Sequence, residues 1–415
     1  MSNSLPSNSR LDYLDAVRGI ALILGIFFHA SLSFMPMYIG WAVMDISTSE
    51  LIPDFVIISH SFRMELFFLI AGFFAHMKFH QQGLPAFLAS RLVRIGIPFI
   101  LGWFLLRPML VSGWIMGAES MRGEADIGSA LSQGLRVLTD IPKDLLVGTH
   151  LWFLYYLLVI SVSVIVIRRV VVSYQPLQPV LAPLSDSIIA WLCQSRLAIL
   201  AVAIPTAGCL WFMDHWGMDT PDKSLIPAIP VVLIYAGFFL FGWLLQRQSE
   251  LLQHFARLSW FKFALCIMAS IASVVLSKFE GQFSHPQYHL IKAAFLLNYA
   301  IMMWALIALS LGLCKRVFTR SSNFIRFIAD SSYWLYLIHL PIVIWLQVAV
   351  AELPLHWTVK WIGICGITLA LSILLYDLFV RSTVIGALLN GKRQPRYLFK
   401  RDDTQQVIKS SAPGT

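Results

Sequence analysis

The chain has 415 residues, of which 58% are hydrophobic and only 13% are charged, and its formal net charge is +9. This composition excludes an ordinary soluble globular protein, in which about a quarter of the residues are charged. The positive charge does not indicate a nucleic-acid partner, because the basic residues lie between apolar runs and in the C-terminal tail. We therefore expect an all-α, polytopic integral membrane protein.

Ten apolar runs come close to the roughly 20 residues that a transmembrane helix needs. We expect them to form one transmembrane domain over residues 14–381, between a cytoplasmic N-terminus (1–13) and a C-terminal tail (382–415) that is first basic and then disordered. The predicted membrane helices cover residues 14–36, 55–77, 95–113, 150–171, 197–213, 225–246, 260–277, 291–313, 332–351 and 357–380.

Lysine and arginine are concentrated in alternate connections between these runs, whereas the other connections carry few of them. Positively charged connections stay in the cytoplasm. An even number of helices with both termini in the cytoplasm follows. The longest outer connection, about 108–149, begins where Arg107 and Pro108 interrupt the third run. The prolines at 176, 179 and 183 predict an extended linker.

The first apolar run carries Asp15, Arg18 and His29. Ionisable groups are costly inside a bilayer, so they usually face a protein interior or a wet cavity. Arg18 and His29 are eleven residues apart, so they share a helix face with roughly 16 Å of rise between them. Leu22 lies between them and leaves that face only partly open. An imidazole there is suited to general-base catalysis; the alternative is a hydrogen bond that only holds packing. Asp15 and Arg18 have the spacing of an ion pair.

The second run opens with His60, Arg63 and Glu65 near the outer leaflet. These side chains either extend to the water at the membrane surface or form an internal polar pocket. We interpret Arg63 as part of a pocket. For His60, as a substrate-binding candidate, both alternatives stay open.

A basic pair, Arg91 and Arg94, precedes the third run on the same side as Arg18. Guanidinium groups match phosphate oxygens, so one interpretation is a clamp for the phosphates of a donor. The other is a pair of anchors for membrane lipid headgroups.

Two further segments place histidines among aromatic residues. His150 and Trp152 begin the fourth run, where they either belong to the interfacial aromatic belt or bind an acceptor sugar. His339 precedes Pro341 in the ninth run, and we interpret it as a structural residue that bonds backbone freed by the proline.

Several chemistries lack support in the sequence. It contains no Walker A motif, no GxSxG, no HExxH and no run of acidic metal ligands. We expect no metal site and no permanently bound cofactor.

Five segments together resemble the membrane-bound acyltransferase-3 family: LDYLDAVRGIALILGIFFH, FRMELFFLIAGFF, RLVRIGIP, HLWFLYYLL and SYWLYLIHLP. They occur in the family's order. The resemblance implies an acyl-CoA donor in the cytoplasm and a carbohydrate hydroxyl as acceptor on the far side. By motif match, His29 is the essential histidine, Arg18 is its partner, and Arg91 and Arg94 are the donor-binding pair. Arg63 matches a polar position of the second helix.

Within the family the chain is most similar to the branch that is implicated in adding succinyl groups to osmoregulated periplasmic glucans. The resemblance therefore implies transfer of a succinyl group from succinyl-CoA. The alternatives are O-acetylation of another envelope polysaccharide, or transport of a carbohydrate or a lipid-linked sugar, because transporters also carry charges within their membrane helices. The sequence leaves a homo-oligomer open.

Overall fold

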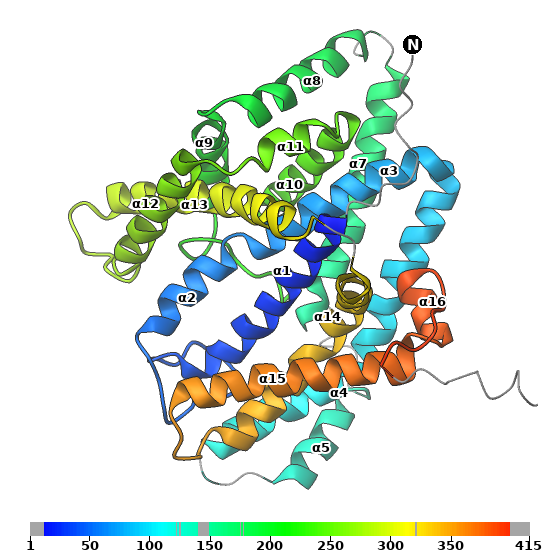
Figure 1. Cartoon of the computed structure of the whole chain (residues 1–415). Helices are drawn as coiled ribbons and strands as arrows, with labels where there is room; N and C mark the ends of the chain where they lie inside the picture. The colour runs from blue at the N-terminus through cyan, green and yellow to red at the C-terminus, as the bar shows by residue number, and fades with distance from the viewer. Residues whose placement is uncertain are drawn as a thin grey trace, which may run out of the picture.

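The computed structural model describes residues 12–121, 123, 126–139, 149–174, 176, 178–319 and 322–398. Within these ranges all regular structure is helical, which confirms the all-α prediction (Figure 1). The elements in chain order are α1 (Asp12–Ser31), η1 (Leu32–Phe34), α2 (Leu51–His60), α3 (Arg63–Arg91), η2 (Leu92–Gly96), α4 (Ile97–Ser120), α5 (Ile127–Arg136), η3 (Thr149–Leu151), α7 (Trp152–Ser173), α8 (Gln178–Gln194), α9 (Ala198–Leu210), α10 (Ile229–Arg247), α11 (Leu251–Phe255), α12 (Trp260–Ser277), α13 (Tyr288–Val317), α14 (Asn323–Val350), α15 (Trp357–Leu375), η5 (Tyr376–Val380) and α16 (Val384–Asn390).

Eight helical stretches among the described residues are long and apolar enough to cross a membrane, and there are nine if the bent pair α8–α9 counts as one broken span. The count differs from the ten predicted runs for a simple reason. The predicted runs 55–77 and 95–113 fall within one helical stretch, Leu51–Ser120, which is counted once although its backbone breaks at Gly83 (φ +75°, ψ 174°). The predicted run 197–213 corresponds to α9, which is too short to cross alone.

Two interpretations of proline were wrong. Pro108 does not interrupt the third run, because α4 continues through it to Ser120. Pro183 lies inside helix α8 and not in an extended linker. A proline is tolerated inside a membrane helix because neighbouring helices and side chains compensate for the backbone groups that it frees.

Helix α1 lies in the middle of the bundle, where it packs mainly on α14 and also on α3, α13 and α15 (Figure 1). Its apolar side chains at Leu14, Val17, Ile26 and Ala30 are almost fully buried. A helix that is apolar on nearly all sides is expected at such a central position. The polar groups of α1 therefore face the interior of the bundle.

Helices α3 and α10 approach each other closely because each contributes a glycine to their contact. A Cβ atom on Gly72 would overlap the carbonyl of Phe239, and one on Gly242 would overlap the carbonyl of Leu69. Small residues let membrane helices pack backbone to backbone. This contact fixes the position of α3, which carries Arg63.

We expect Gly242→Ala to force α3 and α10 apart and to lower the free energy of unfolding by about 1–3 kcal/mol. Gly237→Ala on the same helix is the matched control, because its Cβ would meet open space. The control should be neutral or slightly stabilising, since alanine is the better helix former. Thermal unfolding in detergent measures both; equal melting temperatures for the two variants would contradict the close contact.

Candidate functional site

Two cavities flank α1, one along each half of the helix. The cavity beside its C-terminal half contains His29 and has a volume of about 610 Å³; we call it the His29 cavity. The cavity beside its N-terminal half contains Arg18 and has a volume of about 500 Å³; we call it the Arg18 cavity. The two cavities share four lining residues, which we call the partition: Leu22, Met64, Phe67 and Tyr336. The shared face of α1 therefore leads from one cavity to the other, with Leu22 between them.

The imidazole of His29 lies among aromatic rings in the wall of its cavity. It stacks on the indole of Trp41, with 5.7 Å between ring centroids and 18° between planes. The ring of His339 lies 5.3 Å away on centroids. The buried Nδ1 of His29 has no hydrogen-bond partner among the described residues. A histidine that only held packing would be expected to bond through a buried nitrogen.

Arg63 lies inside the bundle and not at the membrane surface. It is 5% exposed, lines the His29 cavity, and places its guanidinium carbon 4.3 Å from the centroid of the Phe28 ring. Its Nη1 is buried and finds no partner within the described part of the chain. Of the two alternatives left open by the sequence, the structure thus favours the internal pocket. Glu65 is also fully buried.

His60 and His150 line the same cavity and are both held by backbone carbonyls. Nε2 of His60 donates to the carbonyl of Met218 over 3.1 Å, and Nε2 of His150 donates to that of Leu337 over 2.9 Å. A carbonyl only accepts, so each neutral ring carries its proton on Nε2 and leaves Nδ1 as an acceptor. Leu337 is four residues before Pro341, so His150 bonds the carbonyl that the proline frees.

From sequence, His339 was interpreted as a structural residue that bonds backbone freed by Pro341. Its Nδ1 does bond backbone, but at the carbonyls of Leu335 and Tyr336, whereas His150 bonds the freed carbonyl of Leu337. His339 also lines the His29 cavity, which the sequence alone did not indicate. Trp152 lines this cavity too and is only 6% exposed, so it lies in the bundle and not in a lipid-facing belt.

The loop of residues 35–50, which sequence reasoning passed over because it carries no lysine or arginine, brings Trp41 to this cavity. The indole N–H of Trp41 donates to the side-chain oxygen of Gln347 over 2.9 Å. The amide of Gln347 in turn donates to the backbone carbonyls of His29 and Ala30. One glutamine therefore ties the loop, α14 and α1 together at the His29 ring.

A buried ion pair fastens the same loop to α15. Nζ of Lys360 lies 2.7 Å from a carboxylate oxygen of Asp45, and both side chains are 0–1% exposed. The ammonium group also donates to the carbonyl of Ala351 over 3.0 Å. On the other side, Gly117 of α4 gives the loop room, because a Cβ there would overlap the carbonyl of Ala42. The loop is thus held in a single place over the cavity.

Polar residues from the connection between α9 and α10 complete the His29 cavity, namely Thr220, Asp222 and Lys223. Burial raises the pKa of the Asp222 carboxyl above its ordinary value. Thr220 contacts Nε2 of His60 at 3.2 Å. The sequence placed this segment outside the membrane but gave no signal that it folds onto the cavity.

The Arg18 cavity collects cationic side chains from three elements: Arg18, Lys78, Arg91 and Arg94. The predicted pair of Asp15 and Arg18 forms, with 3.6 Å between oxygen and nitrogen, and Arg18 also donates to the hydroxyl of Ser332 over 3.4 Å. Arg94 lies in η2, a turn of π-helix, a feature that is frequent at functional sites. Four cations around one cavity suit a ligand with several negative charges.

Comparison with known proteins gives the family. The model of the acyltransferase domain family (Acyl_transf_3) matches residues 11–377. The chain belongs to this family.

Among curated proteins it is 23% identical to the glucans biosynthesis protein C of Escherichia coli K12, over 94% of this chain and 96% of the relative. The glucans biosynthesis protein C of Escherichia coli O157:H7 matches to the same extent. No solved structure matches the chain. As an acyltransferase-family member with several apolar helices long enough to span a bilayer, the chain is a multi-pass membrane protein.

Proposed function

We propose that this acyltransferase carries an acyl group through the membrane, from an acyl-CoA in the Arg18 cavity to a sugar hydroxyl in the His29 cavity. The observation that carries the proposal is the shared partition between the cavities. The two cavities are separated at the partition by a single layer of side chains. Charge also supports it, because four lysine and arginine side chains line the Arg18 cavity, whereas among the described residues two, Arg63 and Lys223, line the His29 cavity.

The Arg18 cavity fits the donor. Coenzyme A carries phosphate groups, and guanidinium forks bind phosphate oxygens by paired, charge-assisted hydrogen bonds. Arg91 and Arg94 supply such forks, and Arg18 extends the positive lining toward the partition. The prevalence of lysine and arginine at this end indicates the cytoplasm, where acyl-CoA is made. Acyl-CoA is a substrate in this proposal, and no resident cofactor or metal is needed.

His29 is the proposed general base. It accepts the proton of the acceptor hydroxyl as that oxygen attacks the thioester carbonyl. A carbon–oxygen bond forms, the carbon–sulfur bond breaks, and the proton leaves on the coenzyme A thiol. Arg63 is the proposed donor to the oxygen anion that develops at the carbonyl, because its buried Nη1 is not bonded to any described residue. Direct transfer and transfer through a covalent enzyme intermediate share this proton balance.

The acceptor belongs in the His29 cavity, where His60, His150 and Trp152 are the proposed substrate contacts. The relatives named as glucans biosynthesis proteins favour a periplasmic glucan as acceptor, and the branch similarity favours a succinyl group from succinyl-CoA. The location that follows is a bacterial inner membrane, with lipids around the bundle.

The test compares periplasmic glucans from a deletion strain that carries either an empty vector or the wild-type gene, by mass spectrometry. We expect a succinyl-sized mass increase only with the gene. A mass increase of acetyl size would correct the acyl group, and unmodified glucans in both strains would overturn the glucan acceptor. A second experiment places the purified protein in vesicles with acyl-CoA on one side, and it measures both carbohydrate movement and acyl-CoA consumption. Carbohydrate movement without consumption of acyl-CoA would favour a transporter instead.

A further inference from the structure

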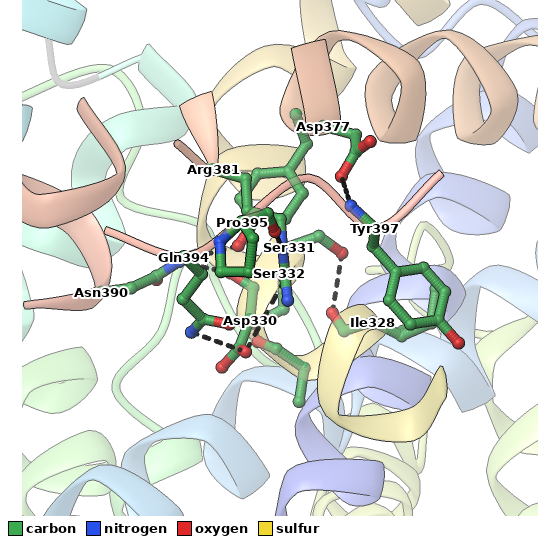
Figure 2. A network of polar contacts seen from close by, with 12 residues as sticks. Ile328, Asp330, Ser331, Ser332, Asp377, Arg381, Asn390, Gln394, Pro395 and Tyr397 are labelled. Carbon is green, nitrogen blue, oxygen red and sulfur yellow. Dashed lines mark hydrogen bonds and ion pairs between the residues drawn. The ribbon is translucent and has the colours of Figure 1, made fainter. Parts of the chain in front are cut away.

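After α16 the chain returns to the end of the bundle that carries the Arg18 cavity. We call residues 391–398 the strap (Figure 2). The strap lies beyond residue 377, where the match to the acyltransferase family ends. Residues 382–415 were expected from sequence to be a basic tail that becomes disordered. Residues 384–398 are instead packed on the bundle, and residues 399–415 lie outside the described part.

Backbone and charged groups fasten the far end of the strap. The carboxylate of Asp377 accepts from the backbone N–H of Tyr397 over 2.7 Å and from that of Leu398 over 3.0 Å. Nε of Arg381 donates to the carbonyl of Pro395 over 2.7 Å. Hydrogen bonds that involve charged groups stabilise a structure more than neutral ones do. The strap is therefore tied to η5 by strong bonds (Figure 2).

The near end of the strap is fastened to the wall of the Arg18 cavity. The side-chain amide of Gln394 donates to a carboxylate oxygen of Asp330, and that of Asn390 donates to the carbonyl of the same residue, each over 3.0 Å. Asp330, Asn390 and Leu389 all line the cavity. The end of α16 thus forms part of the cavity wall, and the strap begins at the next residue.

The first residue of the strap lies against one of the cationic side chains. Gly391 has φ +81°, a conformation that favours glycine, and a Cβ there would overlap the guanidinium of Arg94. The backbone of Arg94 is held separately: its carbonyl accepts a hydrogen bond from the hydroxyl of Tyr333 over 2.6 Å. The position of the Arg94 side chain thus depends on the strap.

We propose that the strap belongs to the donor site and positions Arg94 for the phosphates of acyl-CoA. The proposal rests on the proposed function, since it takes acyl-CoA as the ligand of the Arg18 cavity. It adds to the family domain a segment that the family match does not include. Gly391 acts through Arg94 and is a positioning residue, whereas Asn390, the last residue of α16, lines the cavity.

Gly391→Ala tests the proposal in the full-length protein. The new Cβ displaces the Arg94 guanidinium, so we expect the KM for acyl-CoA to rise about tenfold, which corresponds to about 1.4 kcal/mol of lost binding. The KM for the acceptor and kcat should change little. Gly83→Ala is the matched control: Gly83 has a similar φ of +75°, but its Cβ would meet open space. The control carries the backbone strain without the overlap, so its donor KM should stay at the wild-type value.

A double-mutant cycle separates positioning from general damage. In an Arg94→Ala background, Gly391→Ala should add no further increase in donor KM, because the group that it displaces is already absent. Gln394→Ala should raise the donor KM in the same direction, whereas Lys392→Ala on the exposed side of the strap should not. The role of the strap would be overturned if the effects of Arg94→Ala and Gly391→Ala on the donor KM were additive. It would also be overturned if neither Gly391→Ala nor Gln394→Ala changed the donor KM.

Binding of coenzyme A alone distinguishes this inference from the proposed function. If the wild type binds coenzyme A and the strap variants bind it equally well, the strap inference fails and the proposed function stands. If the wild type neither binds coenzyme A nor transfers an acyl group, the proposed function itself fails.

Discussion

His29→Ala should abolish acyl transfer while the protein still folds. A positioned general base contributes about 10²- to 10⁴-fold to a rate, and no other described residue of the cavity occupies the position between Trp41 and His339. The loss should appear in kcat with little change in the donor KM, because His29 is outside the Arg18 cavity. Single-turnover transfer from acyl-CoA by purified protein measures it.

Two controls decide what the histidine does. His29→Gln keeps a hydrogen-bonding side chain of similar size but has no basic nitrogen, so it should be as inactive as the alanine variant. Added imidazole should restore part of the activity of His29→Ala, since the cavity has a volume of about 610 Å³. Full activity of His29→Gln would assign the histidine to packing and remove it from the mechanism.

Lys360→Met should cause a large loss of stability. It leaves the carboxylate of Asp45 buried without its charged partner, and breaking a buried ion pair in this way costs about 3–5 kcal/mol. The loop of residues 35–50 should loosen as a result and take Trp41 away from His29. Thermal unfolding in detergent and limited proteolysis in this loop measure the two effects.

The double variant Lys360→Met with Asp45→Asn is the informative control. Both charges are then gone, and replacing a buried pair with uncharged residues is often close to neutral, so most of the stability should return. Lys392→Met removes a lysine from the surface and should leave the melting temperature unchanged. A double variant as unstable as the single one would show that the pair does not act through its charges.

Much of the site could be predicted because it depends on spacing along single helices. Arg18 and His29 lie on one face of α1, with Leu22 between them, as helical geometry requires. The pair of Asp15 and Arg18 is equally local. The interpretation of Arg63 as part of an internal pocket came from its neighbour Glu65 on the same helix, and Arg63 is buried beside the His29 cavity.

The rest depends on contacts between distant residues, which a single sequence does not encode in any local pattern. Trp41 gave no signal, because its loop carries neither lysine nor arginine and its partner Gln347 is 306 positions away. His339 was interpreted as structural from its proline alone. The packing of the strap could not be predicted for a similar reason. Its basic residues are typical of a cytoplasmic tail, and Gln394 and Asn390 bond Asp330, which lies about 60 positions earlier in the chain.

The partition has a consequence for the cell's energy supply. A membrane protein with two cavities beside one helix risks becoming a leak for protons, which would dissipate the electrochemical gradient across the membrane. Three of the four partition residues are apolar. Leu22 and Met64 are buried, and Phe67 is partly buried. Apolar constrictions exclude water and ions. This layer is therefore an electrical insulator between the two cavities.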